Sequence, residues 1–95
     1  MKTVERKGRR PARKGILANF QFYLDEDSKG LCQGITLNVS ESGFGFLTEV
    51  QISEGQTITV TKHSLPGFPC SKARVRWVRR GSHCIEAGAE FCSGN

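Results

Sequence analysis

Two short polar motifs, far apart in the chain, carry side chains that bind anions and aromatic bases. The first lies near the N-terminus, where Arg9, Arg10 and Arg13 stand in the run Arg-Arg-Pro-Ala-Arg with the spacing RxxxR. A guanidinium donates two parallel hydrogen bonds to O6 and N7 of guanine, pairs with phosphate in a fork geometry, and stacks on a purine face. The motif is therefore suited to a ligand that carries phosphate groups or purine bases.

The second motif has the spacing NxSxxG and consists of Asn38, Ser40 and Gly43 in the run Asn-Val-Ser-Glu-Ser-Gly. Asn38 offers a donor and an acceptor, and Ser40 offers a hydroxyl. Gly43 permits a backbone turn with positive φ or the close approach of a ligand. The alternative is an ordinary hairpin turn, because Asn, Ser and Gly are also the usual turn residues.

Charge is concentrated in an N-terminal arm. The chain has 95 residues and a net charge of +5. Residues 1–14 hold seven basic side chains and one acidic one, for a net charge of +6, whereas the rest holds seven basic and eight acidic ones, for −1. Basic arms of this kind either bind phosphate groups or remain solvated tails.

The elements that position these motifs are all predicted strands. Apolar residues alternate with period two over 16–24, 31–39, 43–48, 56–62, 72–80 and 84–91, and no stretch has helical periodicity. Short strands at regular spacing, with turn residues between them, predict one all-β domain, either a small antiparallel barrel or a sandwich. We expect a flexible basic arm at 1–14 and the β-domain at 15–92.

Strand parity predicts which side chains face outward. Ile35, Leu37 and Val39 alternate, so Asn38 and Ser40 should share the outer face with Thr36. Trp77 has the same strand parity as Ala73 and Val75, which favours the core, but a position on the surface remains an alternative.

Several classes of protein lack support in the sequence. Four cysteines, at positions 32, 70, 84 and 92, form no CxxC pair, and no apolar signal-peptide region follows the basic N-terminus. We therefore expect reduced thiols in a cytoplasmic protein without membrane insertion. His63 and His83 lack catalytic or metal-ligand spacing, and no GxSxG, HExxH or P-loop motif is present. The chain is predicted to be neither an enzyme nor a metalloprotein.

RxxxR followed by NxSxxG on a small all-β chain resembles the PilZ domain, a bacterial receptor for the second messenger cyclic di-GMP. The stretch Lys-Ala-Arg-Val-Arg-Trp-Val-Arg-Arg at 72–80 and the later Gly-Ala-Glu-Phe at 88–91 look like the last two family strands. The resemblance covers about residues 9–91. It implies a six-stranded antiparallel β-barrel.

The resemblance also implies the ligand and its contacts. The ligand-binding residues would be Arg9, Arg10, Arg13, Asn38, Ser40, Gly43 and, by stacking on a guanine, Trp77. Arg6 and Arg10 satisfy RxxxR as well, but the doubled arginine of the family favours Arg9 and Arg13. No cofactor is implied beyond cyclic di-GMP itself. The arm would fold over the nucleotide, and a protein partner of unknown identity would read the change.

Two alternatives remain open from the residues. A nucleic-acid-binding barrel would use the arm to neutralise phosphates, although few aromatic residues are available for stacking. A PilZ-like adaptor that binds no ligand would have the same fold. The sequence leaves open the pathway, the affinity, the oligomeric state, the number of ligand molecules bound, and whether the chain is a whole protein or a fragment.

Overall fold

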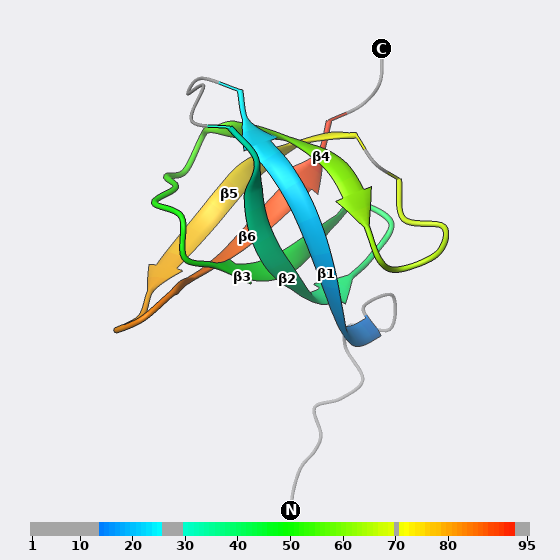
Figure 1. Cartoon of the computed structure of the whole chain (residues 1–95), viewed down its shortest axis with the longest axis horizontal. Helices are drawn as coiled ribbons and strands as arrows, with labels where there is room; N and C mark the ends of the chain where they lie inside the picture. Colours follow the sequence, from blue (N-terminus) through cyan, green and yellow to red (C-terminus); the bar gives the residue numbers. More distant parts are fainter. Residues whose placement is uncertain (1–13, 26–29, 70, 93–95) are drawn as a thin grey trace, which may run out of the picture.

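The computed structural model describes residues 14–25, 30–69 and 71–92 (Figure 1), so Arg9, Arg10 and Arg13 lie outside the described residues. This part of the chain consists of β1 (Lys14–Leu24), β2 (Cys32–Val39), β3 (Gly43–Thr48), β4 (Thr57–His63), β5 (Lys72–Arg80) and β6 (Ile85–Phe91). The predicted strands match these within two residues at each end. β1 begins at Lys14, which pairs with Val39 and is the last residue of the arm as predicted from the sequence.

The six strands close into a barrel in the order β1-β2-β3-β6-β5-β4 (Figure 1). All neighbouring pairs are antiparallel, and β1 pairs with both β2 and β4, which completes the circle. Closure gives every strand a neighbour on both sides, although β4 and β5 pair over only three residues. The structure thus confirms the all-β prediction and decides for the barrel over the sandwich.

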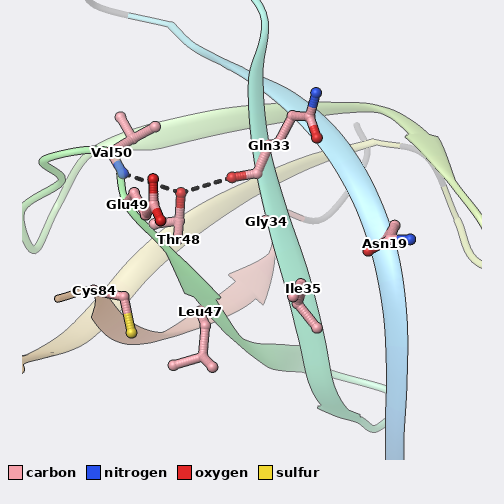
Figure 2. Close-up of a pocket in the computed structure, with 9 residues that line it drawn as sticks. All are labelled: Asn19, Gln33, Gly34, Ile35, Leu47, Thr48, Glu49, Val50 and Cys84. Atoms are coloured by element: carbon pink, nitrogen blue, oxygen red, sulfur yellow. Dashed lines mark hydrogen bonds between the residues drawn. The ribbon is translucent and has the colours of Figure 1, made fainter.

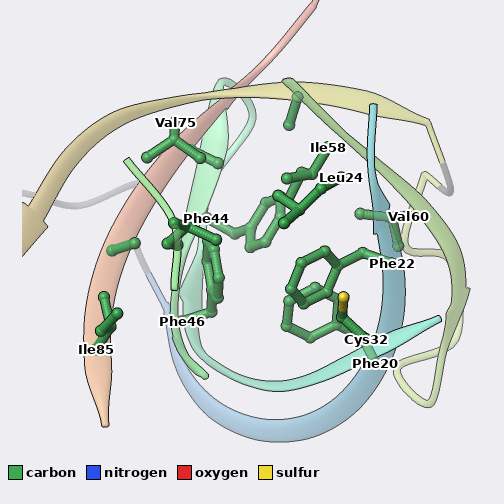
Figure 3. Packing of buried hydrophobic residues seen from close by; sticks show 14 of the residues in the cluster. Phe20, Phe22, Leu24, Cys32, Phe44, Phe46, Ile58, Val60, Val75 and Ile85 are labelled. Atoms are coloured by element: carbon green, nitrogen blue, oxygen red, sulfur yellow. The ribbon is translucent and has the colours of Figure 1, made fainter. Parts of the chain in front are cut away.

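Alternate residues of the strands fill the barrel with aromatic rings (Figure 3). Phe20 and Phe22 of β1 face Phe44 and Phe46 of β3, and all four rings are buried. The ring centroids of Phe20 and Phe46 lie 5.3 Å apart at 90°, a favourable edge-to-face arrangement. Burial of each such side chain stabilises the fold by about 1.5–3 kcal/mol. The predicted inward faces of β1 and β3 are confirmed.

The predicted face of β2 is wrong over the first half of the strand, although Val39 packs against the core as expected. Thr36, expected outside, is fully buried, and Ile35, expected inside, is 41% exposed. The cause is a bulge: Thr36 pairs with Phe46, but Asn38 pairs with Gly45, so Leu37 is an extra residue on β2. An extra residue reverses the parity that follows it. Asn38 therefore still faces outward, as predicted, although for a different reason.

A second bulge decides the position of Trp77. Val75 pairs with Ala89 and Trp77 pairs with the next residue, Gly88, so Arg76 is the extra residue on β5. Val75 is buried, whereas Trp77 is 38% exposed, and Val78 packs against the core. The bulge thus turns the indole outward, which settles the alternative that parity left open.

Two further observations concern chemistry that the sequence raised. Cys84 and Cys92 are free thiols, and Cys70 lies outside the described residues. Within the described part of the chain, the structure contains no helix of the length and apolarity needed to span a membrane.

Candidate functional site

One row of residues crosses the outer face of four adjacent strands. Asn38 of β2 pairs with Gly45 of β3, Gly45 pairs with Gly88 of β6, and Gly88 pairs with Trp77 of β5. The register thus places two of the sequence-predicted site residues at the ends of one row, with only glycines between them. At the usual strand spacing, the row is roughly 14 Å long. Gly45 and Gly88 are buried, because the amide lies over the first and the indole lies over the second.

Trp77 lies on Gly88. A Cβ built on Gly88 would clash with Nε1 and Cε2 of the indole and would come within 2.9 Å of Cδ1. Only glycine leaves room for the ring to rest on the strand. The guanidinium carbon of Arg79 lies 5.8 Å from the ring centroid, within cation–π range. The indole is therefore held in place yet remains partly exposed, as a stacking surface requires.

Asn38 is held in a similar way at the other end of the row. Its Oδ1 accepts a hydrogen bond of 3.2 Å from the backbone N–H of Gly45. A Cβ on Gly45 would lie 3.0 Å from the same oxygen. The absence of that Cβ allows the amide to lie close against β3, which fixes its position on the outer face.

The turn between β2 and β3 is closed by its own side chains. The Ser40 hydroxyl lies 3.3 Å from the Ser42 hydroxyl. The Ser42 backbone N–H also donates a hydrogen bond of 3.3 Å to the Ser40 hydroxyl. The Ser40 backbone N–H donates to the Gly43 carbonyl at 2.8 Å. These bonds account for Ser40 as a turn residue, and they leave its role toward a ligand a prediction.

Gly43 serves neither as a positive-φ turn residue nor as an open surface. The described glycines with positive φ are Gly30, Gly55 and Gly67. A Cβ on Gly43 would instead collide with the carbonyl oxygen of Ala89 on β6. The positive-φ expectation is therefore wrong, and the close neighbour of Gly43 is the backbone of the next strand.

A shallow hollow of about 180 Å³ joins this turn to the indole. Its volume is below the usual range for a whole drug-sized ligand, so it fits one part of a larger molecule. The predicted residues Gly43 and Trp77 both line it, whereas Asn38 and Ser40 lie outside its lining. Sequence reasoning missed its other residues: Ser42, Phe44, Arg76, Gly88, Ala89 and Glu90.

The exposed cations of β5 mostly have partners on the barrel. Arg76 Nε donates to Glu90 Oε1 at 2.7 Å, and Arg79 contacts Glu86 at 3.3 Å. Lys72 pairs with Asp25 at the far end of the strand. Burial alone would raise the pKa of Asp25, but hydrogen bonds and the charge of Lys72 outweigh it and lower that pKa. The face is thus less strongly basic than its sequence suggests.

His63 is a structural residue that the sequence did not single out. Its Nδ1 accepts a hydrogen bond of 3.0 Å from the Leu65 backbone N–H. This leaves Nε2 to donate to the buried Thr36 hydroxyl at 2.7 Å. The ring stacks on Phe68, with centroids 3.7 Å apart, and burial lowers the pKa of His63. A neutral histidine thus ties the loop after β4 to the core.

A second, larger hollow lies beside the row, on the outer face of β2 and β3 (Figure 2). It has a volume of about 510 Å³, and Ile35 and Leu47, which pair across the two strands, are its main apolar side chains. Thr48 donates a 2.8 Å hydrogen bond to the Gln33 carbonyl beneath it. None of the sequence-predicted site residues lines this hollow.

The comparisons with known proteins assign no family. No protein-family model matches the chain, and no curated protein matches it significantly.

Proposed function

We propose that this chain binds cyclic di-GMP and acts as a PilZ-like receptor in the bacterial cytoplasm. The observation that carries the proposal is the row across the outer face, in which Asn38 and Trp77 flank two glycines. These residues are 39 positions apart in the sequence, and two separate bulges turn them to the same side. An amide that reads a base and an indole that stacks on one are suited to a ligand with two bases.

The attachment point of the basic arm adds support. Lys14 pairs with Val39, so the arm joins the barrel beside Asn38 and the turn that follows β2 (Figure 1). Arg9 is five positions from Lys14, and a chain of five residues spans at most about 18 Å. The reach is comparable to the length of the row. Arginines on the arm are therefore within range of phosphates bound along it.

The proposed mechanism is ligand-dependent ordering of the arm. Arg9, Arg10 and Arg13 bind phosphates and guanine, while Asn38 and Trp77 hold the bases on the barrel. Ordering the arm opposes binding, so the bonds made by arginine must outweigh that entropy. The bound arm changes the shape and charge of this surface, and a protein partner reads the change. No catalytic step is part of the proposal.

Titration calorimetry with cyclic di-GMP tests the proposal, at two salt concentrations. The native chain should bind saturably, and the Arg9→Ala, Arg13→Ala double variant should bind at least about tenfold more weakly, as expected for lost charge-assisted bonds. Arg6→Ala is the matched control. This variant should retain binding if the functional RxxxR motif is Arg9 and Arg13. It should lose binding if the functional motif is Arg6 and Arg10.

Other outcomes identify the alternatives. No heat with the native chain contradicts the receptor proposal and favours an adaptor that binds no nucleotide. Steeply salt-dependent binding of single-stranded oligonucleotide, in place of cyclic di-GMP, favours a nucleic-acid-binding barrel. The internal pairing of Arg76 and Arg79 with glutamates speaks against that second function, because those cations are already partly neutralised.

A further inference from the structure

Glu90 of β6 lies close to Trp77 of β5 on the outer face of the barrel. Both residues line the small hollow, together with Gly43 and Gly88. Glu90 and Gly88 are two positions apart on β6, so both face outward at a spacing of about 7 Å. The indole rests on Gly88, and Glu90 is the next outward side chain along that strand. The hollow therefore has an aromatic wall and an adjacent carboxylate.

The carboxylate is held in place with accepting capacity left over. Arg76 Nε donates to Oε1 of Glu90 at 2.7 Å. Within the described part of the chain, Oε2 receives no hydrogen bond, and the Glu90 side chain is half exposed. An ionised carboxylate has about four acceptor sites, so one bond from arginine leaves most of them available. Arg76 thus orients Glu90 without saturating it.

Guanine offers the donors that such a carboxylate requires. Its exocyclic N2 amine is a donor, as is the adjacent N1–H, whereas adenine has no amine at that position. Hydrogen bonds to an ionised acceptor are about twice as strong as neutral ones. The same negative charge repels phosphate, so the phosphates of a ligand would lie away from Glu90, toward the arm.

We propose that Glu90, held by Arg76, is the residue that selects guanine over other purines at the Trp77 end of the site. The carboxylate accepts hydrogen bonds from N1–H and the N2 amine of a base stacked on the indole. This inference rests on the proposed binding of cyclic di-GMP and adds the origin of its base specificity.

The test compares two ligands and three proteins. Cyclic di-IMP differs from cyclic di-GMP by lacking the N2 amine, so it reports on that group alone. The variants are Glu90→Gln and, as a matched control, Glu86→Gln. Glu86 lies on the same strand and also pairs with an exposed arginine, but it lies outside the small hollow. Binding is followed by calorimetry and by the fluorescence of Trp77, the single tryptophan.

The native chain should prefer cyclic di-GMP over cyclic di-IMP by about tenfold, in the range of a good base-specific contact. Glu90→Gln should lose most of that preference, chiefly by weaker binding of cyclic di-GMP, and Glu86→Gln should keep it. Exposed ion pairs contribute little to stability, so both variants should remain folded.

The two proposals fail in different ways. If the native chain binds neither ligand, the receptor function and the role of Glu90 are both refuted. If the native chain binds cyclic di-GMP, and Glu90→Gln keeps the native preference over cyclic di-IMP, only the role of Glu90 is refuted.

Discussion

Substitution by alanine should have different consequences at two glycines. At Gly43 it should destabilise the fold, and at Gly88 it should weaken ligand binding. Both Gly43 and Gly88 face outward, and a Cβ on either one would clash severely with its nearest neighbour. At Gly43 the neighbour is the backbone of Ala89, whereas at Gly88 it is the side chain of Trp77. Backbone in a closed barrel can move away only by separating two paired strands, whereas a partly exposed indole can shift outward.

For Gly43→Ala, the cost follows from overpacking. The Ala89 carbonyl, its carbon and the Cα of Glu90 all lie within 3.0 Å of the added methyl, so β3 and β6 must separate locally. Overpacking of this kind costs typically about 1–3 kcal/mol, and removing a glycine from a strand returns about 0.5–1 kcal/mol. Because the nearest backbone oxygen would lie far inside contact distance of the added methyl, the upper end of the overpacking range applies, and we expect a net loss of about 2 kcal/mol. In a domain of this size, that lowers Tm by roughly 8–16 °C.

For Gly88→Ala, the indole must move outward by about 1 Å or more to restore ordinary carbon contacts of 3.5–4.0 Å. The ring loses its contact with the strand, but the glycine effect partly offsets that loss. We expect stability to change by less than about 1 kcal/mol, within the usual range for surface substitutions and small packing changes. Binding of cyclic di-GMP should weaken by about tenfold, because stacking of one base is disturbed.

Thermal melts followed by circular dichroism measure the stability of the fold, and the fluorescence of Trp77 reports the solvent exposure of the indole. The emission maximum should shift to longer wavelength in Gly88→Ala at 20 °C and stay native in Gly43→Ala below its melting transition. Equal losses of stability in the two variants would refute the reasoning. So would native emission from Gly88→Ala, because the ring would then not rest on that glycine.

The remaining predictions concern the His63 network. Because the folded state lowers the pKa of His63, it binds fewer protons than the unfolded state, so stability should fall as pH drops below about 6.5. Protonation of Nδ1 breaks the bond from Leu65, worth about 1 kcal/mol. Melts at pH 7.5 and 5.5 should therefore differ by several degrees more in the native chain and in His83→Gln than in His63→Phe. Thr36→Val should destabilise the fold by about 1–3 kcal/mol in urea titrations at pH 7.5, because it leaves the imidazole N–H unpaired; unchanged stability would exclude this bond.

The strands were predictable because their signal is local. Alternation of apolar and polar residues identified all six, and the core phenylalanines of β1 and β3 lie where that alternation placed them. The prediction failed at Thr36 and Ile35, because a bulge inserts one residue into β2. A bulge depends on how the partner strand is paired. The sequence of one strand alone therefore does not reveal the bulge.

The site was predictable only in its residue types. Asn38 and Trp77 were named from the sequence, but their common row depends on the register of three strand pairs. Glu90 was missed, because a glutamate on an exposed strand has the pattern of any solvated residue. His63 was missed as a structural residue for a related reason: its partner Thr36 is 27 positions away.

The sequence by itself determined the class of fold, the number of strands, the basic character of residues 1–14 and the chemical types available for binding. These follow from local periodicity and composition, which need no knowledge of neighbours in space. Only the tertiary structure decided that the sheet closes, that Trp77 faces outward, and that two glycines separate it from Asn38. Each of these depends on pairing between strands that are distant in the chain, where a shift of one residue exchanges the inside of the barrel for the outside.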